Sequence, residues 1–463
     1  MSAKRLFYLL FFIGIMLLYN ACKKDTFLTD NTATLSFSRD TVLFDTVFSN
    51  IGSATKQIKV YNPYNQKIKI SSVSLGGGSS SQFRFNIDGF PGPFVKDVEI
   101  LPKDSLFIFV EVTVNPQNAN SPMIVEDSLL FAINGNIQKI PLVAWGQDNY
   151  YINAGIVSGN ANLNNDKPWV IYRYLAVDEN ASLTIPEGTQ LHFYGNARFF
   201  VFGTLKVNGT LERPVVFQGA RLEQYYRELP GQWVGLYFYA GSKENEIQNC
   251  IIKNAIVGIQ ADTNVAPFPT LKLHNTEIKN MREIGLLSVG AKIEATNALI
   301  SECGKYCAAF VIGGEYDFKH CTFANYWNRS SRKTPSIFMN NYYEDNTGKI
   351  QLRPITKADF TNCIIFGNNE DEILFDKEDG ADITYSFKYC ILKSKDTNLS
   401  GSNNYYNQEP GFYNVAERNF SLKENAFAID KGDGSIVNGL LTKDLKDKLR
   451  SIPPDIGAFE YAP

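Results

Sequence analysis

The stretch Ile247–Asn254, with the sequence IQNCIIKN, returns along the second half of the chain in related forms. The next copy, LHNTEIKN, occupies Leu273–Asn280. Each copy is rich in apolar residues and carries a small residue at the same place. This small position is held by Cys250, Thr276, Ala298, Cys321, Cys363 and Cys390, which follow one another after 26, 22, 23, 42 and 27 residues. Repeats of about 20–30 residues are typical of solenoid folds, so this stretch decides the fold class.

The segments around the repeats have no helical connections. Short apolar runs such as Leu191–Phe193 and Val215–Phe217 are separated by single Gly, Asn or Pro residues. A flat parallel sheet would need crossovers of a dozen or more residues, usually helices. We therefore predict a parallel β-helix in which each repeat forms one coil and the small residues stack inside. The longest interval, from Cys321 to Cys363, holds one coil and an insertion of about 15–20 residues.

The N-terminal part follows a different pattern, with a period of two residues from about Thr34 to Asp148. Ser128–Ile133 and Ile137–Ile140 flank Asn134-Gly135, which is a strong hairpin signal. Several short strands with turns between them indicate an antiparallel β-sandwich. The composition then shifts to Asn, Gly and Ala, which marks a domain boundary.

Both parts resemble known families. Residues 34–148, with ILPKDS at 100–105 and VEVTVNP at 110–116, resemble a bacterial immunoglobulin-like domain. The segment LTIPEGTQLHFYGNARFFVFGTLKVNGTLERPVVFQG at 183–219 and the closing PPDIGAFEY at 453–461 are similar to right-handed, pectin-lyase-like β-helix proteins. The resemblance implies an all-β chain: an immunoglobulin-like sandwich, then a right-handed single-stranded parallel β-helix with a C-terminal cap over 149–463. That fold carries lyases, hydrolases and inert scaffolds alike, so it does not fix an activity.

The first residues read as an export signal. Lys4 and Arg5 precede an apolar run of 14 residues, Leu6–Tyr19, which is too short to span a bilayer. Ala21-Cys22 resembles the lipobox of bacterial lipoproteins, of the Bacteroidetes type. The resemblance implies a signal peptide over 1–21, a lipidated Cys22 with a tether over 22–33, and attachment of the surface-exposed protein to the outer membrane.

Composition excludes some classes of partner. The chain has 463 residues, a net charge of −3 and 44% hydrophobic residues, so nothing in it favours a nucleic-acid partner. The cysteines after Cys22 sit mostly in apolar strand-like runs, which predicts buried free thiols. Cys303 and Cys307 are close enough for a local bridge, and the sequence leaves their redox state open.

No motif assigns catalysis, a metal or a cofactor. HExxH, CxxC and GxSxG are absent. Glu315 and Asp317 could form a glycosidase-like carboxylate pair, although such pairs arise by chance. The acidic segment from Glu370 to Asp382 is interpreted as a solvated loop or, alternatively, as a calcium site. We therefore predict no catalytic residue, no metal ligand and no cofactor.

Two insertions provide the candidate binding surface, since aromatic side chains with arginine suit sugar stacking or a protein contact. The opposing interpretation is that these aromatic residues simply cover the helix side. The candidate residues are Tyr326, Trp327, Arg329, Arg332, Tyr342 and Tyr343 in one insertion, and Tyr225 and Tyr226 in the other.

The sequence favours a non-catalytic function, in which a scaffold held at the membrane by the lipid on Cys22 presents loops to a glycan or an outer-membrane protein complex. The alternative is a polysaccharide lyase or glycoside hydrolase acting on an acidic polysaccharide. This alternative predicts Asp or Glu with Arg or Lys converging on one sheet face. A pure spacer is a third possibility.

Overall fold

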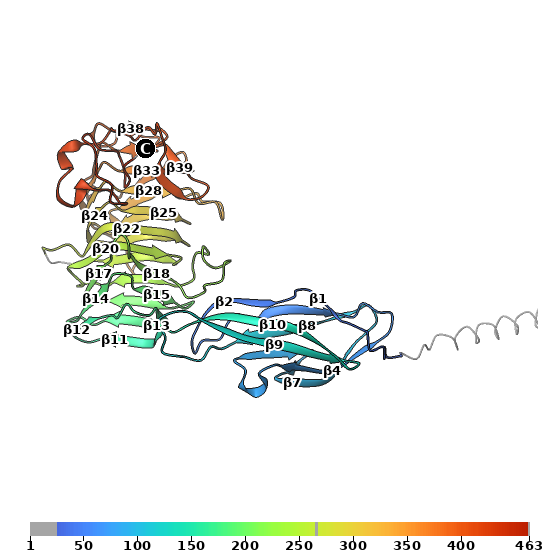
Figure 1. The fold of residues 1–463 in the computed structure, drawn as a ribbon. Coiled ribbons are helices and arrows are strands. Elements are labelled where there is room, and N and C mark those ends of the chain that lie inside the picture. The colour runs from blue at the N-terminus through green and yellow to red at the C-terminus, as the bar shows by residue number, and fades with distance from the viewer. Residues whose placement is uncertain (1–25, 264–266, 462–463) are drawn as a thin grey trace, which may run out of the picture. The chain divides into compact units, whose positions relative to one another are not determined.

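The computed structural model describes residues 26–263 and 267–461, so the predicted signal peptide and Cys22 lie outside the described residues. The chain divides into two compact units between Asp148 and Asn149 (Figure 1). Both are built almost entirely of strands, which confirms the all-β prediction. Among the described residues, no helix has the length and apolar character needed to cross a membrane.

The first unit is a sandwich of two five-stranded sheets with strand orders β1-β3-β8-β5-β6 and β2-β10-β9-β4-β7. Alternating burial along the strands, as in Ile68 and Ile70, fills the space between the sheets. The pairs are antiparallel except β2 with β10, which run parallel. The bounds are β1 Ser36–Phe37, β2 Val42–Phe48, β3 Lys56–Tyr61, β4 Ile68–Leu75, β5 Phe83–Ile87, β6 Phe90–Pro91, β7 Phe94–Ile100, β8 Ser105–Val112, β9 Met123–Ile133 and β10 Asn136–Gln147, with a 3-10 turn at Gly78–Ser80.

The second unit is a parallel β-helix whose described strands fall into three stacks, here named A, B and C. From Ser182 to Asp376 the chain passes through A, B and C once in each coil, and the coil strands after Asp376 lie in A and B only. Stack A contains β12 Asn160–Asn162, β14 Ser182–Pro186, β17 Thr204–Asn208, the first halves of β20 Asn245–Lys253 and β22 Leu271–Met281, β24 Lys292–Thr296, β27 Gly314–Lys319, β32 Ile355–Thr361, β35 Ser386–Lys388 and β37 Gly401–Ser402.

Stack B continues each coil after a turn, and stack C completes it. Stack B contains β15 Gln190–Phe193, β18 Val215–Gly219, the second halves of β20 and β22, β25 Leu299–Cys303, β28 Thr322–Asn325, β33 Ile364–Gly367, β36 Ile391–Leu392 and β38 Tyr405–Tyr406. Stack C contains β16 Arg198–Val201, β19 Gly235–Phe238, β21 Val257–Asp262, β23 Ile284–Val289, β26 Tyr306–Val311, β29 Ile337–Asn340 and β34 Ile373–Asp376. At the start, β13 Trp169–Val177 pairs with β11 Tyr150–Val157 and bends from stack B into stack C.

The small position forms the predicted internal ladder. Cys250 pairs in register with Thr276, and the Cys363 backbone N–H points at the Cys390 sulfur at 3.4 Å. The six described cysteines are buried and free, as predicted. Cys303 and Cys307 are among them.

Asparagine ladders close the turns between stacks A and B. Asn249, Asn275 and Asn297 hold left-handed φ angles of 46°, 46° and 50°, which asparagine tolerates better than most residues. The Asn275 side chain donates to Asn249 at 3.2 Å, and Asn297 donates to Asn275 at 3.0 Å. The turns therefore bond to one another from coil to coil as the strands do.

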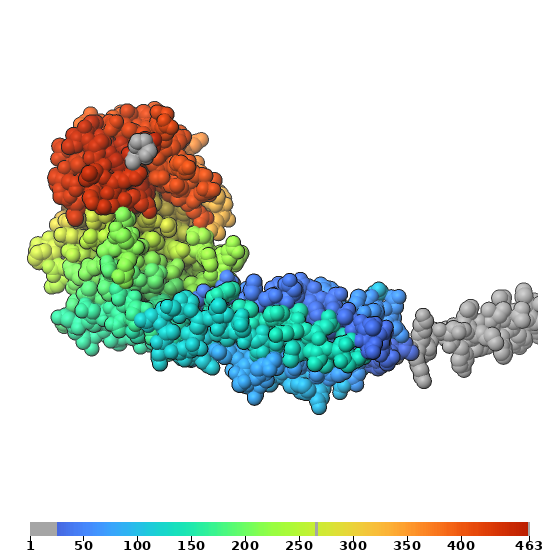
Figure 2. Space-filling view, viewed as in Figure 1, coloured from blue at the N-terminus to red at the C-terminus, as the bar shows by residue number. Residues whose placement is uncertain are grey.

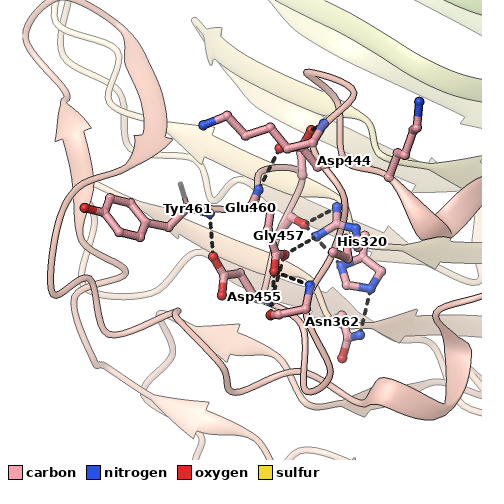
Figure 3. Close-up of polar contacts among 12 residues, drawn as sticks. His320, Asn362, Asp444, Asp455, Gly457, Glu460 and Tyr461 are labelled. Atoms are coloured by element: carbon pink, nitrogen blue, oxygen red, sulfur yellow. Dashed lines mark hydrogen bonds and ion pairs between the residues drawn. The ribbon is translucent and has the colours of Figure 1, made fainter. Parts of the chain in front are cut away.

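A C-terminal cap, which contains the hairpin of β39 Phe412–Asn414 and β40 Asn419–Leu422, covers the outer face of stack B. Its aromatic and aliphatic side chains pack on Ile364 and Ile391. In Figure 2 the red C-terminal residues cover much of the last coils on the face that is shown. Polar contacts fix the cap beneath that surface: His320 lies 3.3 Å from the Gly457 carbonyl oxygen, and Asn362 donates to the ring at 2.9 Å (Figure 3).

Candidate active site

The outer face of stack A carries a column of charged side chains aligned by strand register. The column occupies the repeat position four residues before the small position. From β17 to β32 its members are Lys206, Glu246, Lys272, Glu294, Asp317 and Asp359. Opposite charges alternate through the first four members. The last three, Glu294, Asp317 and Asp359, are all acidic, and we call them the acidic run.

Lysines hold the acidic run together. The Lys357 ammonium lies 2.9 Å from a carboxylate oxygen of Asp317 and 3.6 Å from one of Asp359. Lys319 approaches the same oxygen of Asp317 at 3.3 Å. The hydrogen bond to Asp317 is the largest cause of a raised pKa for Lys357, so this side chain remains a cation at neutral pH.

Like charges directly opposite each other on neighbouring strands repel, and the lysines paired with the run oppose this repulsion. Strands one rung apart are separated by about 4.8 Å, so Glu294 and Asp359 each lie one rung from Asp317. Retaining glycosidases hold two carboxyl groups about 5–5.5 Å apart, and inverting ones about 6.5–9.5 Å apart. The backbone spacing of neighbours in the run is thus close to the shorter carboxyl separation, and the two ends, two rungs or about 9.6 Å apart, lie near the upper limit of the longer one.

The run also remains open to solvent. The side chains of Asp317 and Asp359 keep 23% and 41% of their exposure, so a substrate could reach both. An open carboxylate cluster with neighbouring ammonium groups can donate a proton, hold a developing positive charge, and bind hydroxyl groups. This is the Asp/Glu with Lys arrangement on one sheet face that the enzymatic alternative predicts.

The sequence indicated Glu315 and Asp317 as a carboxylate pair, but the structure places the two residues in separate columns. Both lie on the outer face of β27, but Glu315 pairs with Lys292 at 3.2 Å in the next column. The groups stacked directly on Asp317 are 23 and 42 residues away in sequence. Glu294 and Asp359 are far from Asp317 in sequence, but both stand four residues before the small position of their repeats, which is the signal that places them in one column.

The first insertion is mainly a cover. Trp327 and Arg332 are buried, and Arg332 forms a bidentate ion pair with the fully buried Glu372. Tyr326 stacks near Phe420 of the cap, with ring centroids 6.0 Å apart. These three side chains are placed to fix the insertion on the β-helix.

The other predicted residues are more accessible. On the hairpin of β30 Tyr342–Glu344 and β31 Ile350–Leu352, the Tyr342 hydroxyl donates to Asp376 at 3.0 Å, and Tyr343 lies beside it. In the second insertion Tyr225 is 74% exposed. Its neighbour Tyr226 lies under the Arg221 guanidinium at 3.9 Å.

The two insertions do meet, through Arg329, which donates to the Glu228 carbonyl oxygen. Arg418 of the cap joins this junction, at 3.3 Å from Glu228 and 3.6 Å from Glu302. Burial raises the pKa of Glu302. With only 3% of its surface exposed, Glu302 is closed to a substrate, and the junction serves to fasten the cap.

The remaining candidates lie apart. Within the described ranges, no group of three or more His, Cys, Asp or Glu side chains is placed to hold a metal ion. In the acidic segment after Glu370, Glu372 is the buried partner of Arg332, whereas Glu370 pairs with Lys395 at 2.9 Å on the surface.

Comparison with known proteins adds little to the fold. No family model and no curated protein matches this sequence. One similar solved structure is a family 123 glycoside hydrolase from Clostridium perfringens, at 11% identity and a TM-score of 0.19; the match covers 28% of this chain and 30% of that one. Another is the catalytic domain of a GH87 alpha-1,3-glucanase, at 10% identity and a TM-score of 0.24, covering 80% of this chain and 90% of that one.

These findings correct one prediction. The expectation of a non-catalytic binding or scaffold module is corrected: both matched proteins are glycoside hydrolases, which is the class named in the enzymatic alternative. Likenesses this distant concern the fold alone. The case for a particular chemistry therefore rests on the acidic run.

Proposed function

We propose that the chain is a glycan-cleaving hydrolase whose active site is the acidic run on the outer face of stack A. The observation that carries this proposal is the stacking of Glu294, Asp317 and Asp359 on successive strands. The run breaks the alternation of charge that the same column shows in earlier coils. Repulsive placements of this kind persist at functional sites, where activity offsets the loss of stability.

Hydrolysis needs one carboxyl group to protonate the leaving oxygen and a second to attack the sugar or activate water. Asp317 is common to both neighbouring pairs, Glu294–Asp317 and Asp317–Asp359. Lys357 and Lys319 fix its position and offset the repulsion within the run. Asp317 is therefore the residue whose loss should slow cleavage.

The state of Lys357 favours hydrolysis over elimination. A lyase removes a proton from the sugar ring and needs a base that is neutral at working pH. The raised pKa of Lys357 makes it a poor base, although as a cation it suits an acidic sugar. Carboxylate chemistry is thus better supported here than lysine-driven elimination.

The test is to incubate the full chain, purified in detergent, with polyuronates and neutral glucans, and to analyse the products. The proposal predicts new reducing ends without ultraviolet-absorbing unsaturated ends. Asp317→Asn should slow cleavage by about 10²–10⁴-fold, and Glu246→Gln, in the same column but outside the acidic run, should leave it unchanged. Unsaturated products, or full activity in the Asp317→Asn variant, would contradict it.

We also propose that the enzyme is held at the outer membrane, facing the cell surface, by a lipid on Cys22. The apolar run before Cys22 and the short polar segment after it support this placement. Replacing Cys22 with Ala should move the protein from the membrane to the soluble fraction. Retention of the variant in the membrane would argue against a lipid anchor at this position.

A further inference from the structure

A second surface of the β-helix lies outside the acidic run. It is a groove of about 460 Å³ at the bend between stacks B and C in the first coils. Strand β13 and the turn between β15 and β16 form its walls. The side chains that matter here are Tyr172, Tyr174, Tyr194, Phe200, Arg173 and Arg198.

The aromatic rings of this groove line up from coil to coil. The Tyr172 and Tyr194 ring centroids are 4.9 Å apart, and those of Tyr174 and Phe200 are 6.3 Å apart. Tyr172 remains 47% exposed, so its ring is open to solvent. The rings thus form two neighbouring pairs that carry tyrosine hydroxyl groups, a surface that suits a ligand with both apolar and hydroxylated faces.

The charge of the groove is of one sign. Arg173 and Arg198 line it, and no Asp or Glu does. Over residues 26–263 and 267–461, neither arginine forms an ion pair, whereas the charged side chains of the acidic run are paired with lysines. Two unpaired guanidinium groups beside these aromatic pairs call for an anionic partner, and their planar forks match carboxylate geometry.

We propose that this groove binds an acidic polysaccharide through its carboxylate groups, as a holding site separate from the acidic run. The sugar rings would lie on Tyr172 and Tyr194, and the arginines would bind the uronate carboxylates. A holding site in the first coils would keep a long polymer near the enzyme between cleavage events. The inference goes beyond the proposed function, because binding here does not depend on which residues cleave the polymer.

The experiment measures binding of polygalacturonate, a sulfated dextran and neutral dextran to the full chain in detergent. The background is Asp317→Asn, so that cleavage does not interfere. We expect polygalacturonate to bind, to weaken with added salt, and to bind at least tenfold more tightly than either dextran. The paired variant Tyr172→Ala/Tyr194→Ala and the paired variant Arg173→Gln/Arg198→Gln should each weaken binding about tenfold or more.

Tyr413→Ala, which removes an exposed tyrosine of the cap, is the matched control and should bind as the parent does. Equal binding of neutral dextran would overturn the assignment to an anionic polymer. Equal binding of sulfated dextran would overturn the assignment to carboxylates. Unchanged binding in both paired variants would show that the groove is not the binding site, whatever the outcome for cleavage by the acidic run.

Discussion

The outer faces of stacks A and B differ, although they enclose the same interior. On stack A the charges are solvent-accessible and paired loosely, with Lys357 shared between two carboxylates. On stack B and its corner with stack C, the cap and first insertion bury charges in closed pairs such as Arg332–Glu372, at 2.6 Å. Buried charges are retained when they hold parts of a fold together, whereas an open run of like charges adds no such cohesion.

The largest effect should come from breaking a closed pair. Arg332→Met would leave Glu372 charged and buried, which should lower the free energy of unfolding by about 3–5 kcal/mol. Thermal or urea unfolding would measure this loss, and Arg332→Met/Glu372→Gln should recover part of it. On the open face, Glu246→Gln removes the exposed pair with Lys206 and should cost less than about 1 kcal/mol. Equal losses of unfolding free energy in Arg332→Met and Glu246→Gln would contradict the distinction between closed and open charge pairs.

Acid should act on the covered side through His320. Burial, with a smaller effect from Arg450, lowers the pKa of His320 well below its usual 6.5. The unfolded chain therefore binds a proton first as pH falls, and stability is lost below about pH 6.5. His320→Asn continues the ladder of Asn297 and Asn362, and it should remove up to about 2 kcal/mol of this loss at about pH 5.

The contrary effect of Asp455 provides an internal check on that prediction. Burial raises the pKa of Asp455 to about 6, so the folded state binds a proton there before the unfolded chain does. Asp455 therefore increases the free energy of unfolding as pH falls below about 6, which partly offsets the loss due to His320. Stability measured from pH 7 down to about pH 5 should thus rise in His320→Asn relative to the parent chain. A parallel fall in both proteins would show that His320 does not control the response.

A smaller effect is expected at Glu302, which lies between Ser301 and Cys303 just as Asn280 lies between their partners on the preceding coil. Burial raises the pKa of Glu302, so the protonated carboxyl group favours the folded state. This contribution to the free energy of unfolding is lost as pH rises through the pKa of the folded state. Glu302→Gln should therefore stabilise the fold by about 1–2 kcal/mol at neutral pH, because its amide can donate to the buried Asn280 oxygen, which has no partner among the described residues. The gain should vanish in acid.

Glu283→Gln is the matched control for that variant. Lys305 holds the pKa of Glu283 below its usual range, so this substitution should leave stability unchanged or slightly lower at neutral pH. Unfolding midpoints of both variants at neutral and acid pH would compare the two carboxyl groups. Equal gains from both would indicate a general charge effect and not the local one at Glu302.

The interior of the β-helix was predictable from the sequence, because its small and apolar residues recur at a fixed place in each repeat. The outer surface was less so. Trp327 and Arg332 are residue types typical of a binding loop, but Arg332 is the partner of the buried Glu372. Glu372 lies 40 residues further along the chain, so the sequence around Arg332 does not indicate this pair. Glu294 and Asp359 were not predictable as partners of Asp317 from nearness in sequence, because the stacking of coils brings together residues 23 and 42 positions away.

The most direct test of the open face is the release of reducing ends from a polyuronate by the full chain, its Asp317→Asn variant and its Glu246→Gln variant. General acid–base groups commonly contribute about 10²–10⁴-fold, so the account predicts a loss of that size in Asp317→Asn, with unchanged circular dichroism. It predicts parent-like cleavage in Glu246→Gln. Equal rates in all three proteins, or no cleavage of any glycan by the parent chain, would contradict it.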